Sequence, residues 1–320
     1  MKIMKNEVFE LSIIIVNFHT CQLVKNCIDS ILKLTKGLSY EIVVVDNSED
    51  ENEYLNLLDY SLKSTISIKI INAKKNLGFG KANNLGAMES HSKYLLFLNS
   101  DTLLLNNAFF EMIKILDEHH ELGAVGANLF NKNLKPTTSF VNFQDGPFRA
   151  FLASSWTILA FERFFCKNRS FNHSKKILMI KGYLSGACFA MPAALFKKIG
   201  GFDQRIFMYS EDSLLCNKIK KQGLKIANTP YAKVMHLEGQ SDTTEFSDFK
   251  INNWTFGTYI YAVEVFGKNK AEKYMKRLSA AYRKKSLYYF LCRRKILANN
   301  FRRLSDSFKK FSIELQKNNT

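Results

Sequence analysis

Leu11–Phe18 reads LSIIIVNF and Glu41–Asn47 reads EIVVVDN, and both stretches are apolar runs that end in polar residues. Continuous apolar runs of this length are typical of parallel strands that are buried on both faces of a sheet. Between them, residues 21–35 carry Leu, Val, Cys and Ile at helical spacing. This strand–helix–strand order predicts parallel strands joined by crossover helices.

The same alternation continues along the first half of the chain. Further strands are expected at 66–73, 94–101 and 122–130, and further helices at 51–63, 81–91 and 107–119. The pattern predicts an α/β fold with a doubly wound, mostly parallel sheet and flanking helices. Ligands of such sheets bind at the carboxyl ends of the strands. The chemistry is therefore expected near Asp46 and Asp101, which end two of the predicted strands.

Composition and charge exclude several classes of protein. The 320 residues are 46% apolar and 23% charged, which excludes a disordered, collagenous or fibrous chain. The 46 Lys and Arg residues outnumber the 29 Asp and Glu residues and give a net charge of +17. This excess implies an anionic partner, which would be a nucleic acid, a phosphorylated substrate or an acidic membrane surface.

The positive charge is concentrated in the tail, because residues 251–320 hold 16 Lys and Arg against 4 Asp and Glu. Basic clusters alternate there with aromatic and aliphatic residues at steps of three and four, which predicts amphipathic helices. Two interpretations are open, and both can hold. The helices can form a cap on the body with solvated charges, or residues 270–320 can bind an anionic membrane surface.

Cysteine usage and hydropathy indicate the compartment. The six cysteines are scattered without the spacing of metal ligands, which favours a reducing environment. No stretch approaches the roughly 20 apolar residues of a membrane span, and the longest candidate, 151–161, has about half that length. We expect a cytoplasmic protein that does not span the membrane.

The stretch NLGFGKANN at residues 76–84 joins a predicted strand to a predicted helix. It contains G-x-G-x-x, but Asn83 stands where a dinucleotide-binding motif needs a third small residue, and no P-loop pattern occurs. The simplest interpretation is a tight turn before a helix. Such a turn also favours an anionic or nucleotide ligand at the helix N-terminus.

Acidic and histidine residues offer further chemistry. Asp46 and Asp101 either cap turns or, as carboxylates expected at the ends of neighbouring strands, hold a base or ribose and a divalent cation. Glu211–Asp212 begin a helix expected at 212–222, where they either complement its dipole or provide a base held against apolar walls. His236 follows an expected strand and is either an ordinary histidine or a metal ligand.

Taken together, these residues resemble inverting family-2 glycosyltransferases of the GT-A fold, particularly the rhamnosyltransferase-like branch. The resemblance covers roughly residues 10–245 and is carried by the ordered motifs SIIIVNF, VVVDNS, NLGFGKANN, LLFLNSD, GACFAMP, GGFDQRIFMYSEDSLLCNKIKKQG and VMHLEGQS. It implies a catalytic domain at 1–245 and a basic amphipathic extension at 246–320. It also implies inverting transfer of a sugar, with rhamnose as the first candidate, from a nucleoside diphosphate to a hydroxyl of a cell-surface glycan or lipid-linked acceptor.

The resemblance implies a donor site. By position in the motifs, Asp46 is similar to the residue that binds the nucleotide base or ribose. The loop that lines the nucleotide-sugar is matched by Asn76, Gly78, Gly80 and Asn83.

The resemblance also implies a metal and a base. Asp101 resembles the metal-binding acid of a D-x-D motif, which reads Asn99–Ser100–Asp101 here, so Asn99 replaces one carboxylate. His236 resembles a ligand to the metal or the diphosphate, and the metal would be Mg²⁺ or Mn²⁺. Asp212 resembles the general base, with Glu211 beside it.

The resemblance puts acceptor recognition in residues 131–183, although core packing explains the aromatic residues around 147–165 equally well. A lipid-linked acceptor would place the chain peripherally on the inner face of the cytoplasmic membrane. Two alternatives stay open. One is a non-catalytic basic protein that binds membranes or nucleic acid on a degenerate nucleotide-binding fold, although no nucleic-acid reader motif appears. The other is a nucleotidyltransferase or dinucleotide enzyme on the same sheet.

Overall fold

The computed structural model describes residues 9–142, 170–237 and 245–317. Its strands are β1 (Phe9–Asn17), β2 (Tyr40–Asp46), β3 (Ile68–Asn72), β4 (Ser92–Asn99), β5 (Thr102–Leu104), β6 (Leu122–Phe130), β7 (Phe140–Val141), β8 (Leu178–Met179), β9 (Tyr183–Leu184), β10 (Cys188–Pro192) and β11 (Lys225–His236). Its helices are α1 (Cys21–Leu34), α2 (Glu51–Leu62), α3 (Phe79–Met88), α4 (Ala108–Glu118), α7 (Ala193–Lys198), α8 (Glu211–Lys221), α9 (Asp248–Phe266), α10 (Lys268–Leu291) and α11 (Lys295–Lys317).

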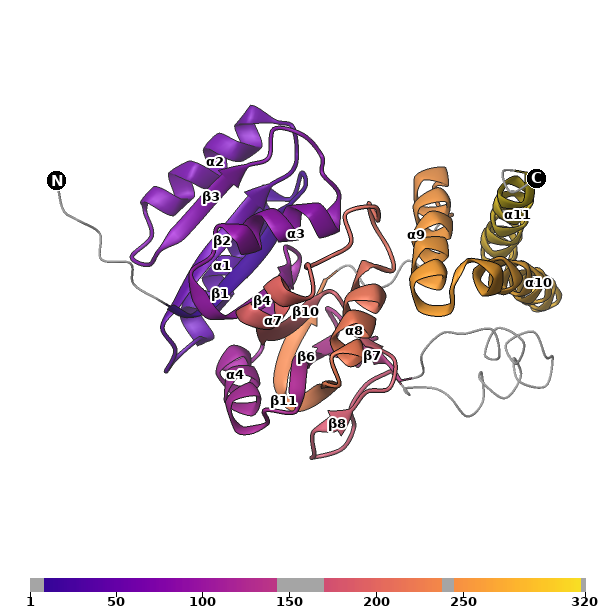
Figure 1. The fold of residues 1–320 in the computed structure, drawn as a ribbon. Helices are drawn as coiled ribbons and strands as arrows, with labels where there is room; N and C mark the ends of the chain where they lie inside the picture. The colour runs from indigo at the N-terminus through magenta and orange to yellow at the C-terminus, as the bar shows by residue number, and fades with distance from the viewer. Residues whose placement is uncertain (1–8, 143–169, 238–244, 318–320) are drawn as a thin grey trace.

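The described strands form one large mixed sheet in the order β3-β2-β1-β4-β10-β6-β11-β5, with β8 paired to β11 (Figure 1). Strand β1 lies parallel to both β2 and β4, β2 is parallel to β3, and β6 is parallel to β11. Strands β10 and β5 run antiparallel to their neighbours. The predicted α/β fold with a mostly parallel sheet and flanking helices is therefore confirmed.

Some element boundaries differ from the sequence-based prediction. The fourth predicted strand ends at Asn99, so Asp101 lies in the turn that leads into β5. The helix expected from residue 81 begins at Phe79, which places Gly80 and Asn83 inside it. The motif CFAMP forms β10, an antiparallel strand in the middle of the sheet that its five residues did not predict.

Alternate residues of the central strands point to opposite faces of the sheet and belong to two separate hydrophobic cores. Ile13 and Ile15 of β1 pack with α1, α2 and α4 on one face. Ile14 of β1 packs on the other face, in a core shared with α3, α7 and α8. Because both faces are covered, the strands had to be apolar throughout, as their sequences are.

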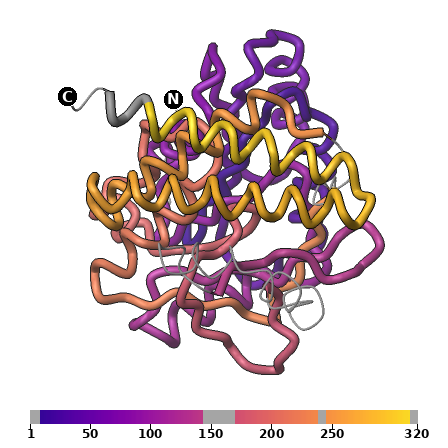
Figure 2. Tube along the Cα trace, turned by 90° about the vertical axis from the view of Figure 1, so that its right-hand side faces the viewer, coloured from indigo at the N-terminus to yellow at the C-terminus, as the bar shows by residue number. Residues whose placement is uncertain are grey.

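The tail forms the three helices α9, α10 and α11, which lie beyond α8 (Figure 1). Helices α10 and α11 lie side by side and antiparallel across one side of the molecule (Figure 2). Their apolar residues meet those of α9 in a core of their own, which contains Ile251, Met275, Phe301, Leu304 and Phe308. This packing confirms the amphipathic helices and matches the interpretation of a cap. Membrane binding stays a prediction, and none of the described helices is both long and apolar enough to cross a bilayer.

Candidate active site

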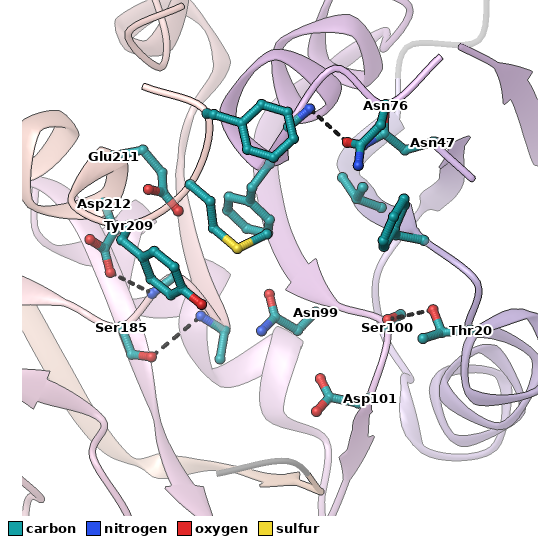
Figure 3. Close-up of a pocket in the computed structure, with 18 of the residues that line it drawn as sticks. Thr20, Asn47, Asn76, Asn99, Ser100, Asp101, Ser185, Tyr209, Glu211 and Asp212 are labelled. Atoms are coloured by element: carbon teal, nitrogen blue, oxygen red, sulfur yellow. Dashed lines mark hydrogen bonds between the residues drawn. The ribbon is translucent and has the colours of Figure 1, made fainter. Parts of the chain in front are cut away.

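A cavity of about 790 Å³ opens where the strands end, and residues from both halves of the chain line it. Figure 3 shows Glu211 and Asp212 on one side, Asn47 and Asn76 on the other, with Asn99 between them. The sheet topology explains this arrangement, because the carboxyl ends of parallel strands meet at one edge. Of the residues proposed from sequence, the cavity lining contains Asn76, Gly78, Asn99, Asp101, Glu211, Asp212 and His236.

The glycine-containing loop before α3 is held by a small network of amide groups. The Asn47 side chain donates to Oδ1 of Asn76 at 2.9 Å and accepts from the Leu77 amide at 2.7 Å. Oδ1 of Asn76 also accepts from the amide of Gly78 at 3.0 Å. Gly78 has φ +80, a left-handed conformation that favours glycine. The network fixes one wall of the cavity.

Asp46 lies beside the cavity but is absent from its lining. It ends β2, and its Oδ1 accepts hydrogen bonds from Nδ2 of Asn17 at 2.8 Å and from Oγ of Ser48 at 2.5 Å. Asn17 ends β1, which lies between β2 and β4, so Asp46 and Asp101 are not on neighbouring strands as expected. The carboxylate of Asp46 therefore binds the chain itself in this structure.

Gly80 and Asn83 also lie outside the cavity lining. Both belong to the first turns of α3, where Nδ2 of Asn83 donates to the carbonyl oxygen of Phe79 at 3.0 Å. A Cβ on Gly80 would lie 3.1 Å from Cβ of Phe202. Gly80 therefore packs α3 against Phe202, Asn83 is bound within α3, and neither residue forms part of the cavity lining.

Asn99, Asp101 and His236 form a polar cluster on the cavity floor. Nε2 of His236 lies 3.2 Å from Oδ1 of Asp101 and 3.3 Å from Nδ2 of Asn99. Strand pairing causes the approach, because His236 at the end of β11 pairs with Thr102 of β5, directly after Asp101. Oδ1 of Asn99 is buried without a hydrogen-bond partner in the described part of the chain.

The polar cluster offers a metal ion an incomplete set of ligands. Asp101 and Asn99 present oxygen atoms and His236 a nitrogen, all of which are donors that divalent cations accept. No group of three or more His, Cys, Asp or Glu side chains placed to hold a metal occurs within residues 9–142, 170–237 and 245–317. The residues present fit a cation that takes its other ligands from a bound anionic molecule, and the unpartnered Asn99 oxygen is consistent with this.

Glu211 and Asp212 begin α8, where negative charge is stabilised by the helix dipole. Oδ2 of Asp212 accepts from the Gly186 amide at 3.2 Å, and Oδ1 accepts from the Ser213 amide at 2.6 Å. Oε2 of Glu211 is buried without a hydrogen-bond partner among the described residues. Burial, followed by the charge of Asp212, raises the pKa of Glu211 to about 8, and burial also raises the pKa of Asp212. A raised pKa makes such a pair a stronger base once it is ionised, which suits it to accept a proton during a reaction.

Some lining residues were missed by the sequence analysis. Asn47 directly follows Asp46 in the motif VVVDNS, and its position was a usable signal. Tyr209 and Phe249 also line the cavity, and Phe249 comes from α9 in the tail. Tyr209 stands two residues before Glu211 in the quoted motif, which was a usable signal, whereas the position of Phe249 depends on how α9 packs. Of the segment 131–183 expected to recognise the acceptor, residues 143–169, which include the aromatic stretch at 147–165, lie outside the described residues.

A family model described as "Glycosyltransferase like family 2" matches residues 10–257. The rhamnosyltransferase WbbL of Escherichia coli K12 is 24% identical over 293 residues, which cover 88% of this chain and 95% of that protein. The O-antigen biosynthesis protein RfbC of Myxococcus xanthus is 24% identical over 226 residues, 68% of this chain and 16% of that protein. The N-acetylglucosaminyl-diphospho-decaprenol L-rhamnosyltransferase of Mycobacterium tuberculosis H37Rv is 40% identical over 60 residues, 19% of this chain and 20% of that protein. The chain thus spans a fifth or less of the length of the latter two relatives.

Solved structures share the fold. GalNAc-T7 with UDP, GalNAc and Mn²⁺ matches with a TM-score of 0.62 and 17% identity, covering 86% of this chain and 52% of that one. TarS 1–349 of S. aureus in complex with UDP-GlcNAc matches with a TM-score of 0.51 and 14% identity, covering 94% and 92%. At these identities the likeness concerns the fold alone, and it confirms the GT-A architecture expected from the sequence.

Proposed function

This chain belongs to glycosyltransferase family 2, and from that membership we propose that it moves a sugar, with rhamnose as first candidate, from a nucleoside-diphosphate donor to a hydroxyl group. The acceptor we propose is a cell-surface glycan or a lipid-linked saccharide. The observation that carries the proposal is that Asp212 faces the same cavity as Asn99, Asp101 and His236. Rhamnose is favoured by the name of the E. coli relative, which aligns over most of both chains.

We place the donor between the amide-held loop and the polar cluster. Asn47 and Asn76 lie on the side of the cavity opposite the acidic pair, and Gly78, bound to Asn76 through its amide, lines the cavity beside them. Asp46 directly precedes Asn47 of this wall, and its Oδ1 is bound by Asn17 and Ser48. A role of its carboxylate in binding the base or ribose stays a prediction. Gly80 and Asn83 support it by packing α3.

Asp101, Asn99 and His236 would hold the divalent cation, Mg²⁺ or Mn²⁺, together with the donor diphosphate. A bound cation of this kind neutralises the charge that develops on a leaving diphosphate. The single carboxylate of the Asn99–Ser100–Asp101 motif makes the diphosphate oxygens necessary ligands.

Asp212 is the proposed general base. In a single displacement, the acceptor oxygen forms a bond to the anomeric carbon while the bond from that carbon to the diphosphate oxygen breaks. The hydroxyl proton moves to Asp212, and the anomeric configuration inverts. The Gly186 and Ser213 amides each bind one carboxylate oxygen of Asp212, which fixes its direction. Glu211 acts beside it by raising the proton affinity of the pair.

We divide the chain into a catalytic domain at 1–245 and a basic helical extension at 246–320. The family match reaches residue 257, and α9 contributes Phe249 to the cavity, so the extension is in contact with the catalytic domain. A buried core shared by α9, α10 and α11 accounts for much of the apolar surface that the sequence left open for membrane contact.

One apolar surface of the extension is exposed at the turn between α10 and α11. This hairpin tip consists of Leu287, Phe290, Leu291 and Ile296, all of them exposed. Residues 281–303 around it hold eight Lys and Arg and no Asp or Glu. Apolar side chains surrounded by positive charge fit an anionic bilayer. We therefore propose that the enzyme works peripherally on the inner face of the cytoplasmic membrane, which would suit a lipid-linked acceptor such as the one in the mycobacterial relative's name.

Protection against thermal unfolding by a panel of nucleotide-sugars, with and without Mn²⁺, tests the donor proposal. We expect one nucleoside-diphosphate sugar, dTDP-rhamnose first, to raise the melting temperature more in the presence of Mn²⁺, with no effect of NAD. Transfer to a polyprenyl-diphosphate saccharide then tests the acceptor. Salt-sensitive binding to nucleic acid, together with no response to any nucleotide-sugar, would support the non-catalytic alternative instead.

A further inference from the structure

Two consecutive residues directly before the acidic pair have an unfavourable backbone conformation. Tyr209 has φ +70 and Ser210 has φ +74, and both values lie in the left-handed region that residues with a Cβ rarely adopt. Ser210 stands at the N-cap position of α8, yet its side chain makes no capping hydrogen bond. Local interactions therefore do not explain this turn, and contacts from elsewhere in the chain must hold it.

Helix α9 supplies one set of these contacts. Gly257 packs so closely on the Tyr209 carbonyl group that a Cβ at position 257 would overlap the carbonyl oxygen. The same Cβ would lie 3.2 Å from the Tyr209 carbonyl carbon and 3.4 Å from Cγ2 of Ile206. One turn earlier, the Trp254 ring lies 6.3 Å from the Tyr209 ring, measured between centroids.

The loop before α3 supplies contacts to the same segment. The amide of Phe79 donates to the carbonyl oxygen of Phe207 at 2.9 Å. A Cβ on Gly78 would overlap that oxygen and would lie 2.8 Å from Cδ2 of Phe207. Residues 207–210 are therefore held between the loop that lines the proposed donor site and a helix of the basic extension.

We propose that Gly257 is a positioning residue for sugar transfer. Its close contact with Tyr209 holds the left-handed turn that directs Glu211 and Asp212 into the cavity. This inference rests on the proposed role of Asp212 as the base. It makes α9 part of the catalytic apparatus and not only of a cap or membrane anchor. Tyr209, Glu211, Asp212 and Phe249 all line the cavity, so a shift of α9 would be felt there directly.

Helix propensity predicts the direction in which Gly257→Ala would change the stability of α9 if position 257 made no contact. Glycine inside a helix is less favourable than alanine, so Gly257→Ala would stabilise α9 if nothing contacted position 257. The structure instead leaves no room for the added methyl group without moving the Tyr209 carbonyl. The close contact with the Tyr209 carbonyl therefore explains the glycine at position 257, where helix propensity alone would favour alanine.

The test measures kcat, the donor KM and the melting temperature of full-length Gly257→Ala. We expect kcat to fall roughly 10- to 100-fold, because small displacements of a reacting group have effects of this size, while the donor KM stays within about twofold. The matched control is Asn252→Ala, which places the same residue at an exposed position of α9 and should not strain the chain. It should keep the wild-type kcat.

Wild-type kcat in a folded Gly257→Ala variant would overturn the proposal, and so would a loss confined to KM. If Gly257→Ala fails to fold, Trp254→Leu provides the second test, because it removes the ring contact that presses the same face of α9, with Gly257, onto Tyr209. Trp254→Leu should lower kcat by a smaller factor without changing the donor KM. A wild-type kcat in this variant would also contradict the proposal. A wild-type enzyme that transfers no sugar would instead show that the proposed function is wrong.

Discussion

The backbone amide of Gly186 donates a hydrogen bond to Oδ2 of Asp212, with 3.2 Å between nitrogen and oxygen. Gly186 precedes β10, and Asp212 begins α8, so the bond joins the sheet to the helix that carries the acidic pair. The other oxygen of Asp212 is held by the amide of Ser213. Oδ1 also accepts from the Ser213 hydroxyl at 3.3 Å, whereas Oδ2 accepts only the Gly186 bond among the described residues and retains a lone pair for a proton. The carboxylate is therefore held in place and still able to act as a base.

Replacing Asp212 by Asn should separate binding from chemistry. Asn keeps the size of the side chain and removes its ability to take a proton. We expect turnover to fall at least ~10²-fold, while protection by the nucleotide-sugar stays near the wild-type value. The control is Asp59→Asn, which removes an exposed carboxylate on α2 far from the cavity lining. Near-normal turnover of Asp212→Asn would remove this residue from the role of base.

Much of the fold and part of the site could be predicted from the sequence. Strands β1, β2, β4 and β6 were found because a strand buried on both faces is a continuous apolar run. Asp101, His236 and Asp212 reach one cavity because strand ends meet at one edge of a parallel sheet. Their chemical roles stay predictions.

The rest depended on long-range packing. The apolar pattern of β2 does not predict that the Asn17 side chain donates a hydrogen bond to the Asp46 carboxylate. The direction of the Gly186 amide is a backbone property without a sequence signature. The contact of Gly257 with Tyr209 depends on how α9 docks, and helical periodicity predicts that a helix forms without predicting its partner.

Replacing Glu211 by Gln should change the pH dependence. Burial and the charge of Asp212 raise the pKa of Glu211 to about 8, and burial raises the pKa of Asp212, so the wild-type rate should increase as pH rises and the pair loses its proton. Gln removes the carboxyl that loses its proton last, so that only Asp212, whose pKa is raised by burial, still titrates. The acid limb of the kcat profile should therefore move to lower pH. A limb that stays in place or moves to higher pH would contradict this coupling.

The same substitution should also change how the stability of the fold depends on pH, with its largest effect at high pH. A carboxyl whose pKa is raised by folding favours the folded state at low pH, and this contribution is lost as pH rises through the folded-state pKa. The melting temperature of Glu211→Gln, relative to that of the wild type, should therefore rise as pH increases from about 5 to about 9. This range covers roughly the interval between the unfolded-state and folded-state pKa values of Glu211. A difference that is constant across this window would show that Glu211 does not titrate as proposed.

Replacing Asp101 by Ala should remove the response to metal. The remaining cluster, Asn99 and His236, lacks the negative charge that attracts a divalent cation. Mn²⁺ should then no longer increase the protection that a nucleoside diphosphate gives against thermal unfolding, and transfer should lose its stimulation by Mg²⁺ or Mn²⁺. His119→Gln, a change at an exposed histidine outside the cavity lining, should respond to metal as the wild type does. An unchanged metal dependence in Asp101→Ala would place the cation elsewhere.

Replacing Leu287, Phe290 and Leu291 together by Ser should release the protein from anionic vesicles. Each of these side chains is about half exposed or more, so the change leaves the core of α9, α10 and α11 intact. Inserting an apolar side chain of this size into a membrane contributes roughly 1.5–3 kcal/mol at full burial. Even at partial burial, three such losses should weaken binding to phosphatidylglycerol vesicles at least ~100-fold in a flotation assay.

Deleting residues 270–320 would be a less informative version of this experiment, because Met275, Phe301, Leu304 and Phe308 pack against α9 and their loss would expose its apolar face. A sharper control replaces Leu62 and Met88 by Ser, since these two side chains are even more exposed than those of the hairpin tip but lie on α2 and α3. That variant should bind vesicles as the wild type does. If it loses binding equally, or if the hairpin-tip variant keeps it, membrane attachment does not occur through the turn between α10 and α11.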